Sequence, residues 1–117
     1  MPKEYKNLYP TEKKLKYGNR KVKLDNILFD SMKEARRYQE LKLQEHCKFI
    51  SNLETQPRFD IKISGQFIAF YKADFKYTKD GAEVVEDVKS AITAKNSTYR
   101  LKKKLVEALY NITIQEV

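Results

Sequence analysis

The sequence predicts a mixed α/β fold, with a central mixed sheet flanked by helices. Short segments rich in aromatic and β-branched residues alternate with two segments of helical spacing. A helix also separates the last two predicted strands. Helical crossovers typically join parallel neighbours, so the sheet should combine parallel and antiparallel pairs. With 117 residues, the chain is long enough to bury a core without disulfides or structural metal.

The first elements are predicted by turn and capping signals. Residues 21–29 contain two short alternating pieces around Asp25-Asn26, which indicates an N-terminal hairpin. Ser31 is a favourable N-cap and Glu34 follows it by three residues, so a helix should run from Met32 to about Cys47. Its apolar face would contain Ala35, Tyr38 and Leu41.

The middle of the chain is predicted to be extended. Residues 50–63 form one extended segment, in which Pro57 indicates an edge or bulged position. Residues 67–77 have the composition of a strand. Asp80-Gly81 is a strong hairpin signal, and residues 83–89 form the returning strand.

The C-terminal part is predicted to contain a loop, a helix and a strand. The loop covers residues 91–97, the helix runs from Thr98 to about Tyr110, and the strand covers residues 112–117. The core face of this helix would contain Leu101, Leu105, Ala108 and Leu109.

Positive charge is concentrated in two segments of a chain whose net charge is +8. Residues 1–24 hold eight Lys/Arg against two acidic residues, and the run from Lys95 to Lys104 holds five Lys/Arg and no acid. We expect residues 1–16, which lack periodicity, to form a flexible basic arm before a single domain at 17–117. Such clusters favour binding to a phosphate backbone, although they could also serve solubility alone. The expected contacts are Lys14, Lys16, Arg20, Arg36, Arg37, Arg100, Lys102 and Lys103.

Several classes of site and location are excluded or disfavoured. The single Cys47 excludes an internal disulfide, and together with the single His46 it excludes a Cys/His zinc site. His46 is also the only candidate base for a nucleophile–histidine pair. No apolar run approaches the length of about 20 residues that a membrane span needs. The N-terminus lacks the apolar core of a signal peptide, so we expect a cytoplasmic protein with no membrane partner.

Two aspartates are predicted to face each other across the Asp80-Gly81 turn. Positions counted outward from the turn place Asp74 directly opposite Asp87. Opposed aspartates on one face have β-carbons about 5 Å apart and their carboxylates repel each other, whereas a magnesium or manganese ion would hold both. Lys89 lies two residues from Asp87 and therefore shares its face. The alternative is an exposed face on which lysines neutralise the two acids.

Glu34 is a further candidate acid. On a helix it points toward the side of Tyr38 and Leu41, and a carboxylate in such a place needs an ion partner or a metal. Ser31 and Glu34 also have the spacing of a capping box, which would explain the glutamate without catalysis. Both interpretations stay open.

These residues resemble a known pattern. Ala73-Asp74, Glu86-Asp87-Val88-Lys89 and a following helix with Tyr99 and several lysines look like the PD-(D/E)XK nuclease superfamily. Phe29 to Tyr38, Gln56-Pro57-Arg58-Phe59 and Tyr71 to Phe75 further resemble a family of small phage and prophage proteins grouped with these nucleases. Endonuclease I-type and archaeal Holliday-junction resolvases would be functional relatives. The resemblance covers residues 17–117 and implies a restriction-endonuclease-like core.

The resemblance also implies roles for individual residues. Asp74 and Asp87 would hold the metal, with the Val88 carbonyl as a possible further ligand and Glu34 as an assisting acid. Lys89 would be the catalytic lysine. Gln56 would line the site or contact nucleic acid, or else have a structural edge-strand role. Ala73 stands where the motif has proline, and a one-residue bulge would exchange Glu86 for Asp87.

The expected function is therefore a magnesium- or manganese-dependent DNA endonuclease with the catalytic residues Glu34, Asp74, Asp87 and Lys89. Branched DNA such as a Holliday junction is the preferred substrate, because no sequence-reading module is visible. Paired cleavage would require a homodimer, located in the host cytoplasm if the chain is phage-encoded. The first alternative is a phage DNA-binding protein that does not cut. An RNA-binding domain is a weaker alternative, because no Gly-aromatic motif marks the strands.

Overall fold

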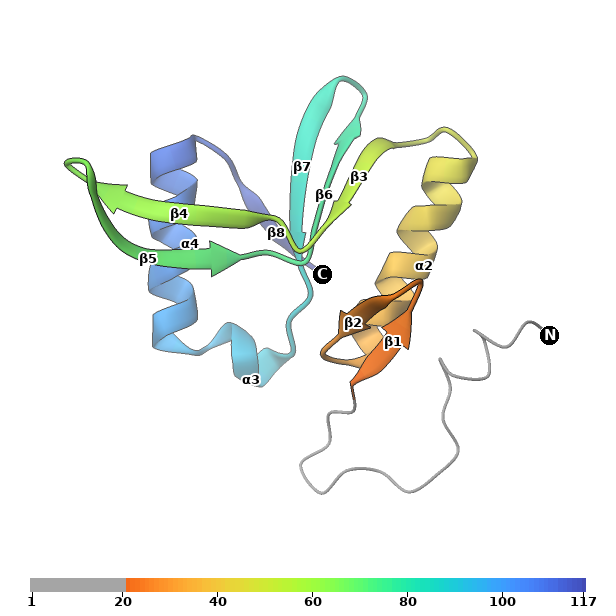
Figure 1. Ribbon diagram of the computed structural model, residues 1–117, viewed down its shortest axis with the longest axis horizontal. Coiled ribbons are helices and arrows are strands. Elements are labelled where there is room, and N and C mark those ends of the chain that lie inside the picture. Colours follow the sequence, from red (N-terminus) through yellow and green to blue (C-terminus); the bar gives the residue numbers. More distant parts are fainter. Residues whose placement is uncertain (1–20) are drawn as a thin grey trace. The chain divides into compact units, whose positions relative to one another are not determined.

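The computed structural model describes residues 21–117 and has a mixed α/β fold with a central mixed sheet and an N-terminal hairpin, as predicted (Figure 1). The chain divides into two compact units, one ending at Leu43 and the other beginning at Gln44. The predicted basic arm, with Lys14, Lys16 and Arg20, lies outside the described residues, and the division into an arm and one domain stays a prediction.

The first unit contains the predicted hairpin and most of the predicted helix. Strands β1 (Val22–Leu24) and β2 (Ile27–Phe29) pair antiparallel around Asp25 and Asn26, whose positive φ values of 53° and 63° suit a tight hairpin turn. Helix α2 (Met32–His46) follows and extends into the second unit. Tyr38 on α2 donates a hydrogen bond to Asp25 Oδ2 at 2.7 Å. The buried positions of α2 are those predicted, namely Ala35, Tyr38 and Leu41.

The second unit contains a four-stranded sheet in the order β3-β6-β7-β8. These strands are β3 (Ser51–Thr55), β6 (Phe75–Lys79), β7 (Ala82–Asp87) and β8 (Ile114–Glu116). The β3–β6 and β6–β7 pairs are antiparallel, whereas β7 and β8 are parallel. The parallel pair confirms the prediction made from the helical crossover.

The two extended segments that were expected to be single strands are each broken once. Strands β4 (Arg58–Ile63) and β5 (Gln66–Lys72) form a separate two-stranded hairpin, whose arms lead directly to β3 and β6 (Figure 1). Thr55 pairs with Phe75 and Arg58 pairs with Lys72, so the register continues unchanged across both breaks. The β3–β6 and β4–β5 pairs therefore form one two-stranded ribbon with a common register. The ribbon is interrupted where residues 56–57 lie beside residues 73–74.

Hydrogen bonds hold the two strands together at this interruption. Gln56 N donates to Asp74 O at 2.8 Å, and Ala73 N donates to Pro57 O at 3.0 Å. Gln56 has a φ of 54°, a left-handed conformation that regular strands exclude. Pro57 has no N–H to donate to a ladder. These two residues explain why the sheet ends here, and the interruption places Asp74 between two strands.

Residues 91–97 contain a short helix instead of the expected loop. Helix α3 (Ala91–Ala94) begins with a capping box, in which Thr93 N donates to Ser90 Oγ at 3.2 Å and Ser90 N donates to Thr93 Oγ1 at 2.9 Å. Asn96 then caps helix α4 (Ser97–Tyr110), and Asn111 ends it in the left-handed conformation with a φ of 54°. The capping side chains of Ser90 and Asn96 thus allow two helices to begin in this polar segment.

The core of the second unit lies between α4, the hairpin and the sheet. Val106 is the buried residue of α4, whereas Leu101 and Leu109 are 60% and 47% exposed. The predicted apolar face of this helix is therefore right for Leu105, which packs against the core beside Val106, and wrong for Leu101, Ala108 and Leu109, which are exposed. The covering elements reach only the strip around Val106, with Tyr99 also partly buried beside it. The other members of this core are Phe59, Ile61, Tyr71, Ala73, Val85 and Ile114.

No helix within residues 21–117 combines the length and the apolar character needed to cross a membrane.

Candidate metal and nucleic-acid site

The β6–β7 hairpin has the predicted register. Lys79 pairs with Ala82 and Tyr77 with Val84, around a turn in which Asp80 and Gly81 have φ values of 51° and 78°. The ladder contains no shift and ends at the pair Phe75 and Glu86. The candidate acids are the next residues on each side of this last pair.

Asp74 lies at the interruption of the ribbon, one residue before β6. Its N–H donates to Glu86 O at 3.1 Å, which fixes the backbone beside β7. Its Oδ2 accepts a hydrogen bond from Val88 N at 2.7 Å. The Asp74 carboxylate is thus hydrogen-bonded to the backbone of the residue that follows Asp87, at the same end of the hairpin.

Asp87 is almost completely buried, with 1% of its surface exposed. Its Oδ2 accepts a hydrogen bond from the Tyr71 hydroxyl. Its Oδ1 lies 3.2 Å from Lys89 Nζ, an ion-pair distance, but has no partner with hydrogen-bond geometry. Buried polar oxygens are almost always hydrogen-bonded. Asp87 Oδ1 is therefore an exception to this rule.

Lys89 shares the face of Asp87, as predicted, and lies between that acid and α4. Its Nζ is 4.7 Å from the centroid of the Tyr99 ring, close enough for a cation–π contact. The Tyr99 hydroxyl donates to Glu116 Oε2 at 2.6 Å, and Glu116 is paired with Asp87 across the parallel strands. Helix α4 and strand β8 therefore both position the lysine.

Two tyrosine hydroxyls at this site stay protonated over the working pH range. Burial raises the pKa of Tyr71 far above its usual value, and the Asp87 charge raises it further. Burial also raises the pKa of Tyr99, with a further contribution from its hydrogen bond to Glu116. Both groups are therefore permanent hydrogen-bond donors to carboxylates.

Glu86 lies on the opposite face of β7 from Asp87. It is also 1% exposed, and its Oε2 accepts a hydrogen bond from the Tyr77 hydroxyl. Because the β6–β7 register contains no shift, Asp87 and not Glu86 is the acid that shares a face with Lys89.

Glu34 belongs to the other unit and takes part in the start of α2. Its N–H donates to Ser31 Oγ at 3.2 Å, and its Oε2 accepts from Asp30 N at 3.3 Å. This arrangement resembles the expected capping box, except that the carboxylate reaches one residue further back. Its assignment to a metal site stays a prediction.

The predicted nucleic-acid contacts within the described residues lie on two helices and at the interruption of the ribbon. Arg36 and Arg37 lie on α2, where Arg37 pairs with Glu40 at 3.0 Å. Arg100, Lys102 and Lys103 lie on α4. Lys103 Nζ is 3.9 Å from both Glu107 and Glu116, so part of its charge is neutralised within the chain. Gln56 is half-buried at the interruption of the ribbon, where its N–H contacts Asp74 O.

Sequence reasoning missed the roles of Tyr71, Tyr99 and Glu116. Tyr71 lies three residues before Asp74, in a segment whose composition predicted only a strand. The signal that could have identified it is alternation: Tyr71 shares a strand face with the core residue Ala69. Tyr99 and Glu116 come near the site only through the packing of α4 and β8.

The fold and this geometry define a mixed α/β protein with an acidic pair and a lysine at the end of a strand hairpin. The chain belongs to the family described as "Protein of unknown function (DUF1064)", whose model matches residues 14–115. No curated protein and no solved structure matches the chain.

Proposed function

We propose that the chain is a magnesium- or manganese-dependent DNA endonuclease, with Asp74 and Asp87 as metal ligands and Lys89 as the catalytic lysine. The single observation that carries the proposal is the buried Asp87 carboxylate. Its Oδ1 lacks a hydrogen bond although it lies 3.2 Å from Lys89 Nζ. A buried carboxylate oxygen without a hydrogen bond is costly, and a divalent cation beside the lysine would be a partner of the right charge and hardness.

The chemistry of the donor set fits magnesium. No group of three or more His, Cys, Asp or Glu side chains suited to a metal occurs within residues 21–117. Magnesium, however, typically binds to one or two carboxylates and completes its shell with water and substrate phosphates. Asp74 and Asp87 would supply the two carboxylates, and the Val88 carbonyl between Asp87 and Lys89 would be a further oxygen ligand.

Each group in the site would have a defined role in phosphodiester hydrolysis. The bound metal would supply a water of lowered pKa and positive charge at the phosphate. The Lys89 ammonium would stabilise the negative charge that develops on the phosphate. Tyr71, whose hydroxyl stays protonated, would hold one oxygen of Asp87 and so fix the direction of the other.

The DNA is proposed to be branched, with a Holliday junction as the preferred form. The basic residues Arg100, Lys102 and Lys103 on α4 would contact the phosphate backbone, which carries no sequence information by itself. One site cuts one strand, so a paired cut would need two copies of the chain. The resemblance to resolvases and the positive net charge of +8 support this substrate class.

The proposal is tested by cleavage of four-way junctions and of plain duplex DNA in the presence of magnesium. We expect Asp74→Asn and Lys89→Ala each to lower the cleavage rate by at least about 100-fold, since both changes remove charge at the reacting phosphate. Matched controls in the same unit are Asp80→Asn, in the exposed hairpin turn, and Lys79→Ala, at an exposed strand end. Retention of cleavage by either site variant would refute the assignment.

A second candidate is a DNA-binding protein that does not cut. The observation that favours it is that both acids already have partners in the chain, because Val88 N binds Asp74 and Lys89 lies beside Asp87. On this interpretation the site is a structural ion-pair cluster. Wild-type protein that binds junctions without cutting them under any divalent metal would favour this candidate.

A further inference from the structure

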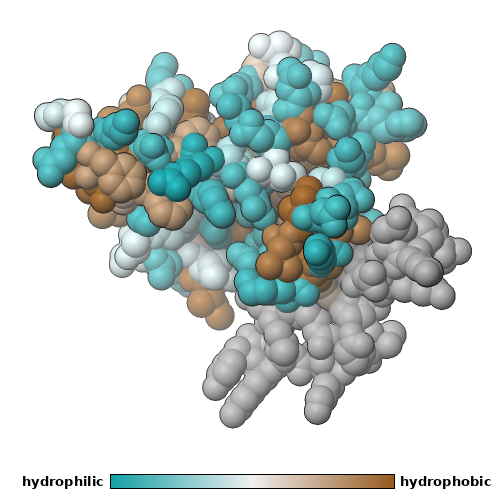
Figure 2. All heavy atoms as spheres, viewed as in Figure 1, coloured by the Kyte–Doolittle hydropathy of each residue, from teal (hydrophilic) through white to brown (hydrophobic). Residues whose placement is uncertain are grey.

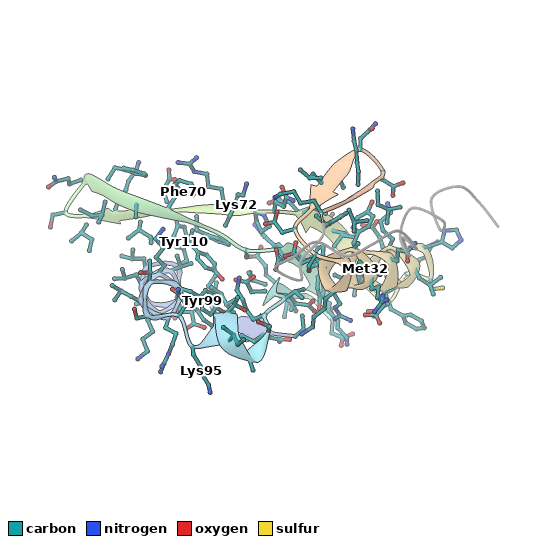
Figure 3. The ribbon with its side chains drawn as sticks, turned by 90° about the horizontal axis from the view of Figure 1, so that it is seen from below. Met32, Phe70, Lys72, Lys95, Tyr99 and Tyr110 are labelled. Atoms are coloured by element: carbon teal, nitrogen blue, oxygen red, sulfur yellow. The ribbon has the colours of Figure 1, made fainter. Side chains whose placement is uncertain are left out.

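The β4–β5 hairpin exposes one of its two faces. Its inner face is buried, because Phe59, Ile61, Ala69 and Tyr71 pack in the core with α4. Side chains alternate along a strand, so the neighbouring residues point to the other side. Figure 3 shows Phe70 and Lys72 on the side of the hairpin away from α4, whereas Tyr110 lies between the two elements.

We call this side the outer face, and its residues are Arg58, Asp60, Lys62, Phe67, Ile68, Phe70 and Lys72, with Arg58 ion-paired to Asp60 at 3.0 Å. A register shift extends its apolar part. Ile61 pairs with Ala69 and Lys62 with Phe67, so Ile68 is an extra residue in β5. Phe67 shares the face of its partner Lys62. Large apolar side chains are exposed here, with fractions of 50% for Phe67, 55% for Ile68 and 42% for Phe70.

Cations are interleaved with these aromatic rings. The Arg58 guanidinium carbon lies 4.1 Å from the centroid of the Phe70 ring, and Lys72 is paired with Arg58 across the strands. Lys102 of α4 also approaches Phe70, with its Nζ 5.8 Å from the centroid. Figure 2 shows hydrophobic and hydrophilic atoms intermixed over this hairpin. The surface therefore combines planar groups with positive charge.

We propose that the outer face binds single-stranded DNA. Unpaired bases would stack on Phe67 and Phe70, and the flanking cations would contact the phosphates, a combination used by proteins that bind single strands without sequence preference. The charges disfavour a second copy of this chain as the occupant. Arg58, Lys62 and Lys72 outnumber Asp60 on this side, so two such faces would repel each other.

The position of the outer face links it to the candidate active site. Phe70 is four residues from Asp74, at most about 13 Å along an extended chain. A strand held on this face would lead toward the acidic pair, and the substrate would then have an unpaired segment beside the cut. This role in cleavage rests on the proposed nuclease function, whereas binding of the single strand does not.

The first experiment measures binding by the full-length chain to fluorescent 20-nucleotide oligo-dT and to a 20-base-pair duplex, with EDTA present. We expect Phe70→Ala to weaken the affinity for the single strand by at least about 5-fold, the loss of one stacked base. Duplex affinity should change by less than about 2-fold. Phe49→Ala is the matched control, because Phe49 is 70% exposed and precedes β3 in the same unit. An equal loss on both DNAs, or no loss, would overturn the proposal.

A second variant keeps the test valid if Phe70→Ala fails to fold. The chain contains no tryptophan, so Phe70→Trp introduces a single reporter that retains an aromatic ring. Its fluorescence should be quenched by oligo-dT and not by duplex, and absence of quenching would overturn the proposal. Sedimentation of both variants is measured in parallel, since a change in oligomeric state would identify the face as an interface between copies.

A third measurement separates charge from stacking. Lys72→Ala should reduce the slope of log K against log salt on the single strand by about 0.7, the contribution of one phosphate contact. An unchanged slope would overturn the proposal that the cations of this face hold the phosphates of the single strand. All these measurements exclude metal, so they test single-strand binding apart from cleavage. Such binding, combined with no junction cleavage in the separate magnesium assay, would support this inference and refute the nuclease. Cleavage in that assay without single-strand binding in EDTA would support the nuclease and overturn this inference.

Discussion

The two acids at the end of β7 are neighbours in the sequence but occupy different environments. Glu86 and Asp87 are each 1% exposed, and each accepts a hydrogen bond from a tyrosine, Tyr77 and Tyr71 respectively. The difference lies on the face of Asp87. There Lys89 adds a cation, and one carboxylate oxygen has no hydrogen bond.

The comparison shows that burial and a tyrosine partner do not by themselves identify a reactive acid. A buried carboxylate with a tyrosine donor can have a purely structural role. The combination of a second oxygen without a hydrogen bond, a neighbouring lysine and a second acid at the same strand end distinguishes Asp87. If Asp87 binds a metal, substitutions at the two acids should have very different consequences.

The largest expected difference is in DNA cleavage. Asp87→Asn should lower the rate by about 10³-fold or more, because it removes a proposed metal ligand and the charge beside Lys89. Glu86→Gln retains the shape of its side chain on the other face and should leave the rate within a few-fold of wild type. Cleavage of a four-way junction with magnesium measures both. Equal losses at folded variants would show that the two environments do not differ in function.

A smaller difference is expected in stability. Tyr71→Phe removes the hydroxyl bonded to Asp87 and should lower the unfolding free energy by about 1.5–3 kcal/mol, the usual range for a hydrogen bond to a charged group. Tyr77→Phe should have a similar effect through Glu86. Urea denaturation with and without magnesium separates them. Magnesium should enlarge the loss for Tyr71→Phe only, because this variant no longer orients the proposed ligand Asp87 and gains less from the bound ion. An identical response of both variants would contradict the metal assignment.

Metal binding should also raise the melting temperature of the wild-type chain. At 10 mM magnesium, a site with a Kd of about 1 mM adds about 1.4 kcal/mol to the unfolding free energy. For a domain of this size that corresponds to a shift of roughly 5 °C. Glu86→Gln should retain the shift and Asp87→Asn should lose it. A shift that survives Asp87→Asn would place the ion elsewhere.

The smallest effect is expected in alkaline solution. Burial raises the pKa of Tyr71 in the folded chain above the unfolded value of about 10, so the unfolded state loses its proton first. The stabilising contribution is complete below pH 10 and falls as the pH rises, by about 0.8 kcal/mol at pH 10.5. Denaturation curves at pH 9 and 10.5 should show this loss in wild type and a smaller one in Tyr71→Phe. An unchanged loss would mean that Tyr71 ionises as a free phenol does.

The sequence predicts those features that depend on neighbours in the chain. Asp25-Asn26 and Asp80-Gly81 form the expected turns, and α2 begins at Met32 and buries the expected residues. The register beyond Asp80-Gly81 follows from the turn, so the closeness of the Asp74 backbone to Glu86 and Val88 could be expected. Residue spacing alone also predicts that Lys89 shares the face of Asp87.

Other features depend on segments that are distant in the sequence. The interruption at 56–57 and 73–74 involves hydrogen bonds between two strands, and only Pro57 gives a local sign of it. The buried strip of α4 around Val106 is set by what covers the helix and not by its own apolar residues. Tyr71 and Tyr99 become partners of Asp87 and Lys89 only after the hairpin and α4 pack together.

The length of the β4–β5 hairpin separates its tip from the acidic pair. The Ser64-Gly65 turn lies at the far end of β4 and β5, and Gly65 has no atom within 4 Å of an added Cβ. Exposed turns of this kind tolerate inserted residues. A peptide tag or a dye-labelled cysteine at this turn should leave the spacing of the carboxylates unchanged, which makes the tip a convenient attachment point for single-molecule work on this family.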